Sequence, residues 1–291
     1  MKKILVTGAN SYIGQSFEKY MSKWPEEYQV ETIDMIDGTW RSKDFSAYDV
    51  VYHVAGIAHR KETSENAGLY YEVNRDLSVE VAQKAKREGV DQFIFLSTMS
   101  VYGKNVGVIT KETQPLPVTH YGKSKLEAEK CIETLRDDRF LLAILRPPMV
   151  YGKNCKGNFQ SIIKLVQKLP IFPKVKNQRS MIYIDHLSLF VKMCIDKKVD
   201  GLYFPQNREY IQTTDIANIV ASSINKRIYF SRLLGLAVKI CMPFLTIAQK
   251  GFGTLVYHDT EDFDYEYCIR DNSESISESV CIDGGTSVWM N

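Results

Sequence analysis

Short apolar runs alternate with segments of helical periodicity from the first residues of this 291-residue chain. An apolar run of a few residues, rich in β-branched and aromatic side chains, is typical of a strand buried on both faces. Such runs lie at residues 4–7, 30–34, 50–55, 93–97 and 141–145, and helical patterns lie between them at 15–23, 74–88 and 121–136. Because strands that alternate with helices form parallel sheets covered on both faces, the sequence predicts a doubly wound α/β unit over residues 1–150.

The regular alternation ends near residue 150. Five prolines interrupt the stretch from 147 to 205, and helical periodicity returns at 158–168 and 215–224. Residues 181–196 are predicted to rejoin the sheet as a strand and a helix. Residues 151–180 and 197–270 then make a smaller second unit. The Ser-, Glu- and Gly-rich segment 271–291 is predicted to be a loose tail.

The composition excludes several classes of protein. Lys and Arg total 37 against 35 Asp and Glu, so the net charge of +2 gives no case for a nucleic-acid partner or a polybasic membrane anchor, but it does not exclude a local basic patch. The sequence contains no apolar stretch of 18 residues, which argues against a membrane span. The six cysteines form neither a CxxC pair nor a zinc-like cluster: Cys131, Cys155, Cys194, Cys241, Cys268 and Cys281. We therefore expect a cytoplasmic protein with reduced thiols and no metal site.

A glycine-containing run, Thr7-Gly8-Ala9-Asn10-Ser11-Tyr12-Ile13-Gly14, follows the first predicted strand and opens the first helix. Gly8 permits a tight turn, and Gly14 permits close packing of helix on sheet. The helix N-terminus then offers free N–H groups to a pyrophosphate. Glycines after a strand are also common in ordinary turns, so the position between strand and helix carries the prediction of a dinucleotide site. The residues assigned to it are Gly8, Asn10, Ser11, Tyr12, Ile13 and Gly14.

Asp34 ends the second predicted strand, 20 residues after Gly14. A carboxylate at this position accepts hydrogen bonds from the adenosine ribose and repels a 2′-phosphate. The alternative is a surface Asp at a strand end. The prediction is NAD(H) in preference to NADP(H), although the nearby Arg41 keeps NADP(H) open.

Tyr121 and Lys125 lie four residues apart at the start of a predicted helix, so both project from one face. A neighbouring ammonium lowers the pKa of a phenol, which then exchanges a proton near neutral pH. A YxxxK match is frequent by chance among 17 tyrosines and could mark only a solvated helix face. Thr98, which follows the fourth strand at the carboxyl edge of the sheet, adds a hydroxyl that could hold the reacting oxygen.

Taken together and in order, these motifs resemble the extended short-chain dehydrogenase/reductase superfamily, in its NAD-dependent nucleotide-sugar epimerase/dehydratase group. The further motifs that carry the resemblance are Val51-Tyr52-His53-Val54-Ala55-Gly56, Val101-Tyr102-Gly103 and Leu145-Arg146-Pro147-Pro148-Met149-Val150-Tyr151-Gly152. The resemblance implies a Rossmann-type sheet, a mostly C-terminal substrate-binding domain and a homodimer formed through helices 74–88 and 121–136.

The resemblance also implies roles for single residues. Thr98, Tyr121 and Lys125 are expected to be catalytic, with Tyr121 and Lys125 also touching the cofactor. Ala55, Gly56 and Pro148 are expected to line the cofactor site. The residues expected to bind substrate are Thr98, Ser100, Tyr121, Asn158 and Arg179, where Arg179 would grip a nucleotide diphosphate through its guanidinium.

The sequence departs from the family pattern in three respects, at four positions. Ser11 replaces the middle glycine of the phosphate loop, and Met149 replaces an asparagine that contacts substrate in many 4-epimerases. Met99 and Ser100 stand where 4,6-dehydratases have an acid and a base, so dehydration is not expected.

The resemblance implies reduction of a UDP-linked 4-keto-6-deoxy-N-acetylhexosamine for surface polysaccharide synthesis. The alternative enzyme is a UDP-sugar 4-epimerase with tightly bound NAD, and the alternative of another class is a non-catalytic, dinucleotide-sensing scaffold. The apolar segment 233–248 is expected to pack over the sugar pocket, with contact to a membrane surface as the second interpretation.

Overall fold

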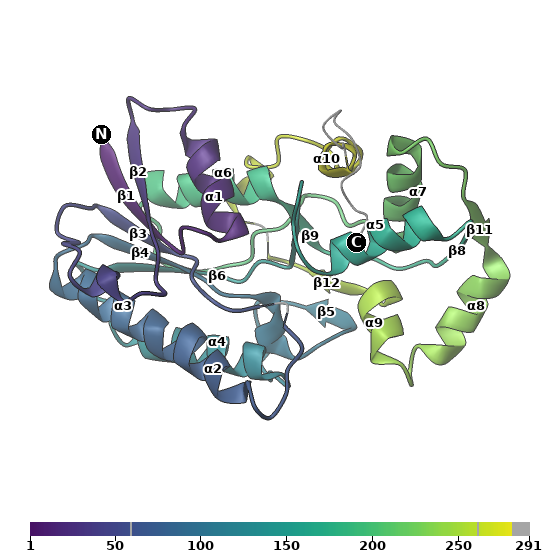
Figure 1. Cartoon of the computed structure of the whole chain (residues 1–291), viewed down its shortest axis with the longest axis horizontal. Helices are drawn as coiled ribbons and strands as arrows, with labels where there is room; N and C mark the ends of the chain where they lie inside the picture. The colour runs from purple at the N-terminus through teal and green to yellow at the C-terminus, as the bar shows by residue number, and fades with distance from the viewer. Residues whose placement is uncertain (59, 261, 281–291) are drawn as a thin grey trace.

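The computed structural model describes residues 1–58, 60–260 and 262–280. Its centre is a six-stranded parallel sheet with the order β10-β6-β4-β3-β1-β2 (Figure 1). The strands are β1 (Lys2–Thr7), β2 (Tyr28–Ile33), β3 (Val50–His53), β4 (Gln92–Leu96), β6 (Leu141–Leu145) and β10 (Gly201–Tyr203). The predicted α/β fold class with a Rossmann-like sheet is therefore confirmed.

Alternate side chains of each strand enter different cores, because successive residues of a strand point to opposite faces. In β1, Ile4 and Val6 belong to one buried cluster and Leu5 to the other. Helices cover both faces (Figure 1). One face carries α1 (Tyr12–Met21) and α6 (Ile184–Asp196), and the other carries α2 (Ala67–Tyr71), α3 (Leu77–Arg87) and α4 (His120–Glu133). A π-helical turn, η2 (Glu72–Asp76), joins α2 to α3.

The remaining elements form a smaller layer beside the carboxyl edge of the sheet. Three helices there share a core with Tyr151 and Phe159: α5 (Asn158–Lys168), α7 (Thr213–Ser223) and α10 (Asn272–Val280). Three two-stranded parallel pairs complete it: β7 (Met149–Tyr151) with β9 (Met181–Tyr183), β8 (Ile171–Pro173) with β11 (Tyr229–Ser231), and β5 (Gly107–Ile109) with β12 (Leu255–Tyr257). Short 3-10 turns are η1 (Thr39–Arg41), η3 (Met99–Tyr102) and η4 (Phe263–Tyr265).

Helices α8 (Arg232–Cys241) and α9 (Thr246–Phe252) stand at the end of the molecule far from the main sheet (Figure 1). Gly235 is the only buried residue of α8, and α9 has none. The expectation that the apolar side chains of 233–248 pack over the sugar pocket is therefore wrong, because most of these side chains are exposed.

Two further sequence expectations differ from the structure. Strand β9 pairs with β7 and not with the main sheet, whose sixth strand is β10; only α6 returns to cover that sheet. The predicted loose tail is wrong for residues 272–280, which form α10 and bury Ile276 against α7. Residues 281–291, including Cys281, lie outside the described part. The division into domains at residue 150 stays a prediction.

Candidate active site

The phosphate loop lies between β1 and α1, as the sequence predicts. Gly8 has φ +96°, and a Cβ on it would lie 3.2 Å from the backbone of Ala55, so glycine is needed for both conformation and close approach. Ser11 caps α1: its hydroxyl accepts a hydrogen bond from the N–H of Gly14 at 3.0 Å. The Ser11 backbone has φ −81°, which requires no glycine. A hydroxyl cap thus replaces the glycine without straining the turn.

The side chains of Tyr12 and Ile13 point away from this loop into the hydrophobic cores. The Tyr12 hydroxyl is buried against Gly152 and Ile184, and burial raises the pKa of this phenol. These two residues can therefore serve a cofactor only through the backbone of the first helical turn.

Asp34 follows β2 beside the loop. Its carboxylate accepts hydrogen bonds from Asn10 Nδ2 at 3.0 Å and from the N–H of Ile36 at 2.8 Å. Arg41 is held elsewhere: both its Nε and Nη2 donate to Glu80 at 2.7 Å, and its guanidinium stacks on Trp40. The partner of Arg41 is thus a carboxylate of α3.

Close contacts connect the phosphate loop to the Tyr/Lys motif. Gly8 abuts Ala55, and a Cβ on Gly56 would lie 3.4 Å from the Nζ of Lys125. Gly8, Ala55, Gly56 and Lys125 therefore form one continuous series of contacts at the carboxyl ends of β1 and β3. Pro148 is buried just before β7.

Tyr121 lies in the first turn of α4, and its hydroxyl faces Thr98, close enough for the Thr98 side chain to act on its pKa. Two features fix this turn: a close approach that requires Gly122, and hydrogen bonds to the carboxylate of Glu62. A Cβ on Gly122 would lie 2.6 Å from the carbonyl oxygen of Ser100, so glycine lets α4 approach η3. Glu62 accepts hydrogen bonds from the N–H groups of His120 at 2.9 Å and of Tyr121 at 3.0 Å.

Burial raises the pKa of Tyr121, and the Thr98 side chain opposes this rise. Tyr121 is half-buried, whereas Lys125 is buried. Its Nζ donates to the Leu96 carbonyl at 2.9 Å and lies 4.6 Å from the centre of the Phe95 ring. Burial lowers the pKa of Lys125 to about 8, with Glu129 opposing. The expectation that the phenol pKa is lowered is therefore wrong for this arrangement.

The sequence analysis missed a set of polar side chains behind these residues. Asn74, in the π-helical turn, accepts from the N–H of Ile57 at 2.8 Å and donates to Ser124 at 3.2 Å. Glu129 receives two donors: the hydroxyl of Ser97 and the guanidinium of Arg146, whose Nη2 lies 2.5 Å away. The available signal was spacing, since Glu129 continues the interval of four residues from Tyr121 and Lys125.

Arg179 is buried, and its Nη1 donates to the carbonyl oxygen of Gly253 at 3.1 Å. Among residues 1–58, 60–260 and 262–280, no carboxylate forms an ion pair with Arg179, and burial lowers its pKa. A buried guanidinium without a counter-ion favours an anionic ligand. Asn158 is exposed at the first residue of α5, Ser100 is exposed in η3, and Met99 beside it is buried.

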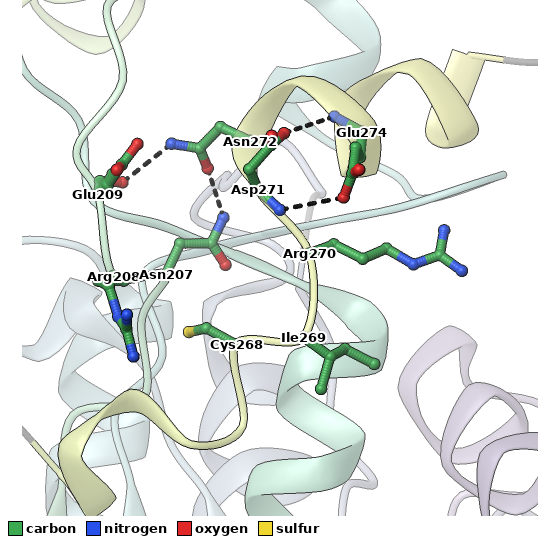
Figure 2. Close-up of a pocket in the computed structure, with 9 residues that line it drawn as sticks. All are labelled: Asn207, Arg208, Glu209, Cys268, Ile269, Arg270, Asp271, Asn272 and Glu274. Atoms are coloured by element: carbon green, nitrogen blue, oxygen red, sulfur yellow. Dashed lines mark hydrogen bonds between the residues drawn. The ribbon is translucent and has the colours of Figure 1, made fainter.

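A cavity of about 360 Å³ lies elsewhere, where the 207–209 loop faces the start of α10 (Figure 2). Its walls include Arg208, Cys268 and Arg270. None of the predicted site residues lines it. In the described part of the chain, no group of three or more His, Cys, Asp or Glu could hold a metal ion.

Comparison with known proteins identifies the family of this chain. Residues 4–202 match the NAD dependent epimerase/dehydratase family. The UDP-glucose 4-epimerase of Vibrio cholerae is 31% identical over 252 residues, covering 77% of this chain and 76% of that protein. The N-acetyl-alpha-D-glucosaminyl-diphospho-ditrans,octacis-undecaprenol 4-epimerase of Escherichia coli O157:H7 is 26% identical, covering 84% of this chain and 80% of that protein.

Among solved structures, UDP-glucuronic acid 4-epimerase from Bacillus cereus, in complex with UDP-glucuronic acid and NAD, superposes with a TM-score of 0.72. It is 22% identical and covers 96% of this chain and 98% of the other, a likeness of fold. Residues 4–202, which match the family, include both the phosphate loop and the Tyr/Lys motif. The chain belongs to the NAD-dependent epimerase/dehydratase family.

Proposed function

We propose that this protein is a 4-epimerase of sugars carried on a diphosphate, with a nucleotide sugar such as a UDP-hexose or UDP-N-acetylhexosamine as substrate. The observation that carries the proposal is the pair of hydroxyl groups of Thr98 and Tyr121, which face each other at the carboxyl edge of the sheet. Lys125 and the glycine loop adjoin the pair. The resemblance to the Vibrio cholerae enzyme supports the choice of epimerisation.

The phosphate loop fits a dinucleotide. A Cβ at Gly8 or Gly14 would meet neighbouring atoms within 3.2 Å, so the loop has the close-packed form that a pyrophosphate-binding turn needs. The first turn of α1 presents the N–H groups of Tyr12 and Ile13, and Asp34 is placed for a ribose diol. NAD(H), when bound, supplies the acceptor and donor of the C4 hydride.

The charges around Asp34 favour NAD(H) over NADP(H). Asp34 would repel a 2′-phosphate, and the bidentate ion pair with Glu80 engages the guanidinium of Arg41 that could have neutralised it. Freeing Arg41 for a phosphate would expose Glu80 as a second negative charge nearby.

The chain's own residues would handle the proton at the C4 oxygen. As a phenolate, Tyr121 would take the proton of the C4 hydroxyl when C4 is oxidised, and the resulting phenol would return it when C4 is reduced. Thr98 holds the same oxygen and stabilises the phenolate through a hydrogen bond. The ammonium of Lys125, close behind at Gly56, adds positive charge and a ribose contact.

The buried guanidinium of Arg179, which pairs with no carboxylate in the described part of the chain, would bind the diphosphate that links sugar to carrier. Ser100 is exposed within η3 and Asn158 is exposed at the first residue of α5, and both are proposed as further substrate contacts. With Met99 and Ser100 where a dehydratase needs an acid and a base, no elimination of water is proposed.

The second candidate is reduction of a UDP-4-keto-6-deoxy-N-acetylhexosamine by the same residues. Met149 favours it, because this half-buried thioether cannot donate the hydrogen bonds that an asparagine offers in many 4-epimerases. A non-catalytic scaffold is the third, and the intact Thr98, Tyr121 and Lys125 speak against it. A cytoplasmic homodimer built through α3 and α4 remains a proposal; the described helices include none able to span a membrane.

One experiment separates these candidates. The purified protein is dialysed extensively, and bound dinucleotide is measured before UDP-glucose and UDP-N-acetylglucosamine are added without cofactor. An epimerase retains NAD and yields the C4 epimer. Loss of dinucleotide, with NADH-dependent turnover of a 4-keto sugar, would establish the reductase. No turnover in either assay would support the scaffold.

A further inference from the structure

Helices α8 and α9 and the turn between them, residues 232–252, form an arm with an outward apolar face. Leu233 is 77% exposed, Phe244 is 84% exposed and Ile247 is 87% exposed. Leu236, Ile240 and Leu245 are also exposed. Large contiguous apolar patches are rare on monomeric proteins and mark interaction sites.

The orientation of α8 is fixed by a glycine. A Cβ on Gly235 would lie 2.1 Å from the carbonyl oxygen of Lys174, so the helix rests on the chain beside β8 through this residue. Leu233, Leu236 and Ile240 follow helical spacing and lie on the opposite side of α8. The helix thus has an apolar stripe like a core helix, but the stripe faces outward.

The Lys, Arg, Asp and Glu residues of the arm and of the sequence that flanks it all carry one sign of charge. Residues 216–258 contain Lys226, Arg227, Arg232, Lys239 and Lys250 and no Asp or Glu. Residues 151–180, which supply α5 and β8 beside the arm, contain seven Lys or Arg and no Asp or Glu. The rest of the chain holds 25 basic and 35 acidic residues. The small net charge of the chain is therefore the sum of a basic part, residues 151–180 and 216–258, and an acidic remainder.

These cations are free to act on a partner. None of the five basic residues in 216–258 forms an ion pair with any part of the chain that the structure describes, and Lys226 donates only to carbonyl oxygens of α5. Arg232 and Lys239 lie on α8 along one side of the apolar stripe. Apolar side chains rimmed by unpaired cations match the interface of an anionic bilayer.

We propose that the arm docks on an anionic lipid surface, with the stripe inserted among the headgroups and the cations against lipid phosphates. The inference goes beyond the proposed function and does not depend on it. With 10 residues, α8 is about 15 Å long, too short to cross a bilayer, so it lies in the interface. A second copy fits poorly, because symmetric pairing of two stripes would place cations against cations.

Docking would also orient the candidate active site. Gly253 directly follows the arm, and its carbonyl accepts hydrogen bonds from Arg179 at 3.1 Å and from Asn177 at 3.2 Å. Thr213 donates to Gly251 at 2.8 Å. The arm is therefore attached at Arg179, and a docked molecule presents the Arg179 end of its site to the membrane.

The test is co-sedimentation of the full-length protein with vesicles of phosphatidylcholine alone or with a third of phosphatidylglycerol. We expect binding to the anionic vesicles only, weakened by salt. The charge variant R232Q/K239Q should bind about 30-fold more weakly, because each cation near such a surface contributes about 1 kcal/mol. The apolar variant I240S/F244S should lose binding, whereas the control L116S/V118S, at equally exposed sites elsewhere, should bind like the wild type.

Circular dichroism checks that each variant is folded, and F244W adds a second signal, a blue shift of tryptophan emission on anionic vesicles. Equal binding by the wild type and I240S/F244S would overturn the proposal, as would absence of binding to either vesicle. A dimer that dissociates only in I240S/F244S would assign the stripe to a second copy and also overturn it. Because no turnover is measured, failure of the 4-epimerase proposal leaves this result unaffected.

Discussion

Lys125 donates a hydrogen bond from its Nζ to the carbonyl oxygen of Leu96, the last residue of β4, at 2.9 Å. The ammonium is thereby fixed to the end of the strand that leads to Thr98. It is buried, and its pKa of about 8 lies well below that of an ordinary lysine. Its charge therefore changes within the pH range in which such a protein can be studied.

Lys125 should make folding stability depend on pH. Its pKa is about 8 when folded and about 10.4 when unfolded, so between these values the unfolded chain binds more protons. Stability contributed by this group therefore rises with pH from about 8, with a slope approaching 1.4 kcal/mol per pH unit. In urea unfolding at several pH values, the free energy of unfolding of the wild type should therefore rise with pH relative to that of Lys125→Met. Parallel curves for the two proteins would refute the burial of a titrating lysine.

Replacing the Tyr121 hydroxyl should separate catalysis from folding. Tyr121→Phe keeps the ring but removes the group that exchanges the proton, so turnover should fall by about 10²–10⁴-fold. Dinucleotide affinity, measured by titration, should change little. The matched control is Tyr71→Phe, which removes a nearby hydroxyl that contacts His120 instead of Thr98. Near-normal turnover by Tyr121→Phe would rule out the proposed proton route.

Asp34 should set the choice of dinucleotide. The wild type should bind NADH more tightly than NADPH. Asp34→Ala should reduce this difference in affinity, because it removes the charge repulsion between the carboxylate and the 2′-phosphate. Asp37→Ala serves as control, since that carboxylate instead receives hydrogen bonds from Thr39. A wild-type preference for NADPH in the same titrations would show that Asp34 has another role.

The ion pair between Glu129 and Arg146 should be essential to stability. Both side chains are buried, so Glu129→Gln leaves a guanidinium with a weakened partner, and removing a member of such a pair typically costs about 3–5 kcal/mol. Because the amide of Gln keeps one oxygen that can accept a hydrogen bond from Arg146, we expect a loss near the lower end of this range. Glu80→Gln, in the exposed pair with Arg41, should cost less than about 1 kcal/mol. Similar unfolding free energies for both variants would contradict this difference.

The parts of the site that were predictable from sequence are those fixed by local spacing. Gly8 and Gly14 stand at a strand-to-helix turn, and Tyr121 and Lys125 share a helix face, so their placement follows from backbone geometry alone. The fold class followed similarly from the order of strands and helices. Thr98 was placed by the rule that ligands bind at the carboxyl edge of such a sheet.

The rest depends on contacts between distant segments. Glu62 caps the turn of Tyr121 from a loop 58 and 59 residues away, and a periodicity argument has no access to this pairing. The pKa of Tyr121 depends on the balance of burial against hydrogen bonding, which only the packed structure defines. The outward face of α8 depends on Gly235 meeting the Lys174 carbonyl. An apolar stripe has the same spacing whether it faces a core or a membrane.

The π-helical turn at Glu72–Asp76 makes the helix irregular, and this irregularity positions Asn74 for its contacts. Such a turn accommodates one residue more than an α-helical turn would, and it commonly occurs at functional sites. Deleting one residue there would let α2 and α3 merge into a single regular helix. The deletion would also rotate Asn74 away from Ile57 and Ser124, the contacts that link this helix to the loop after β3 and to α4. A variant with a better helix would thus have a worse site, and helix content alone would not reveal the damage.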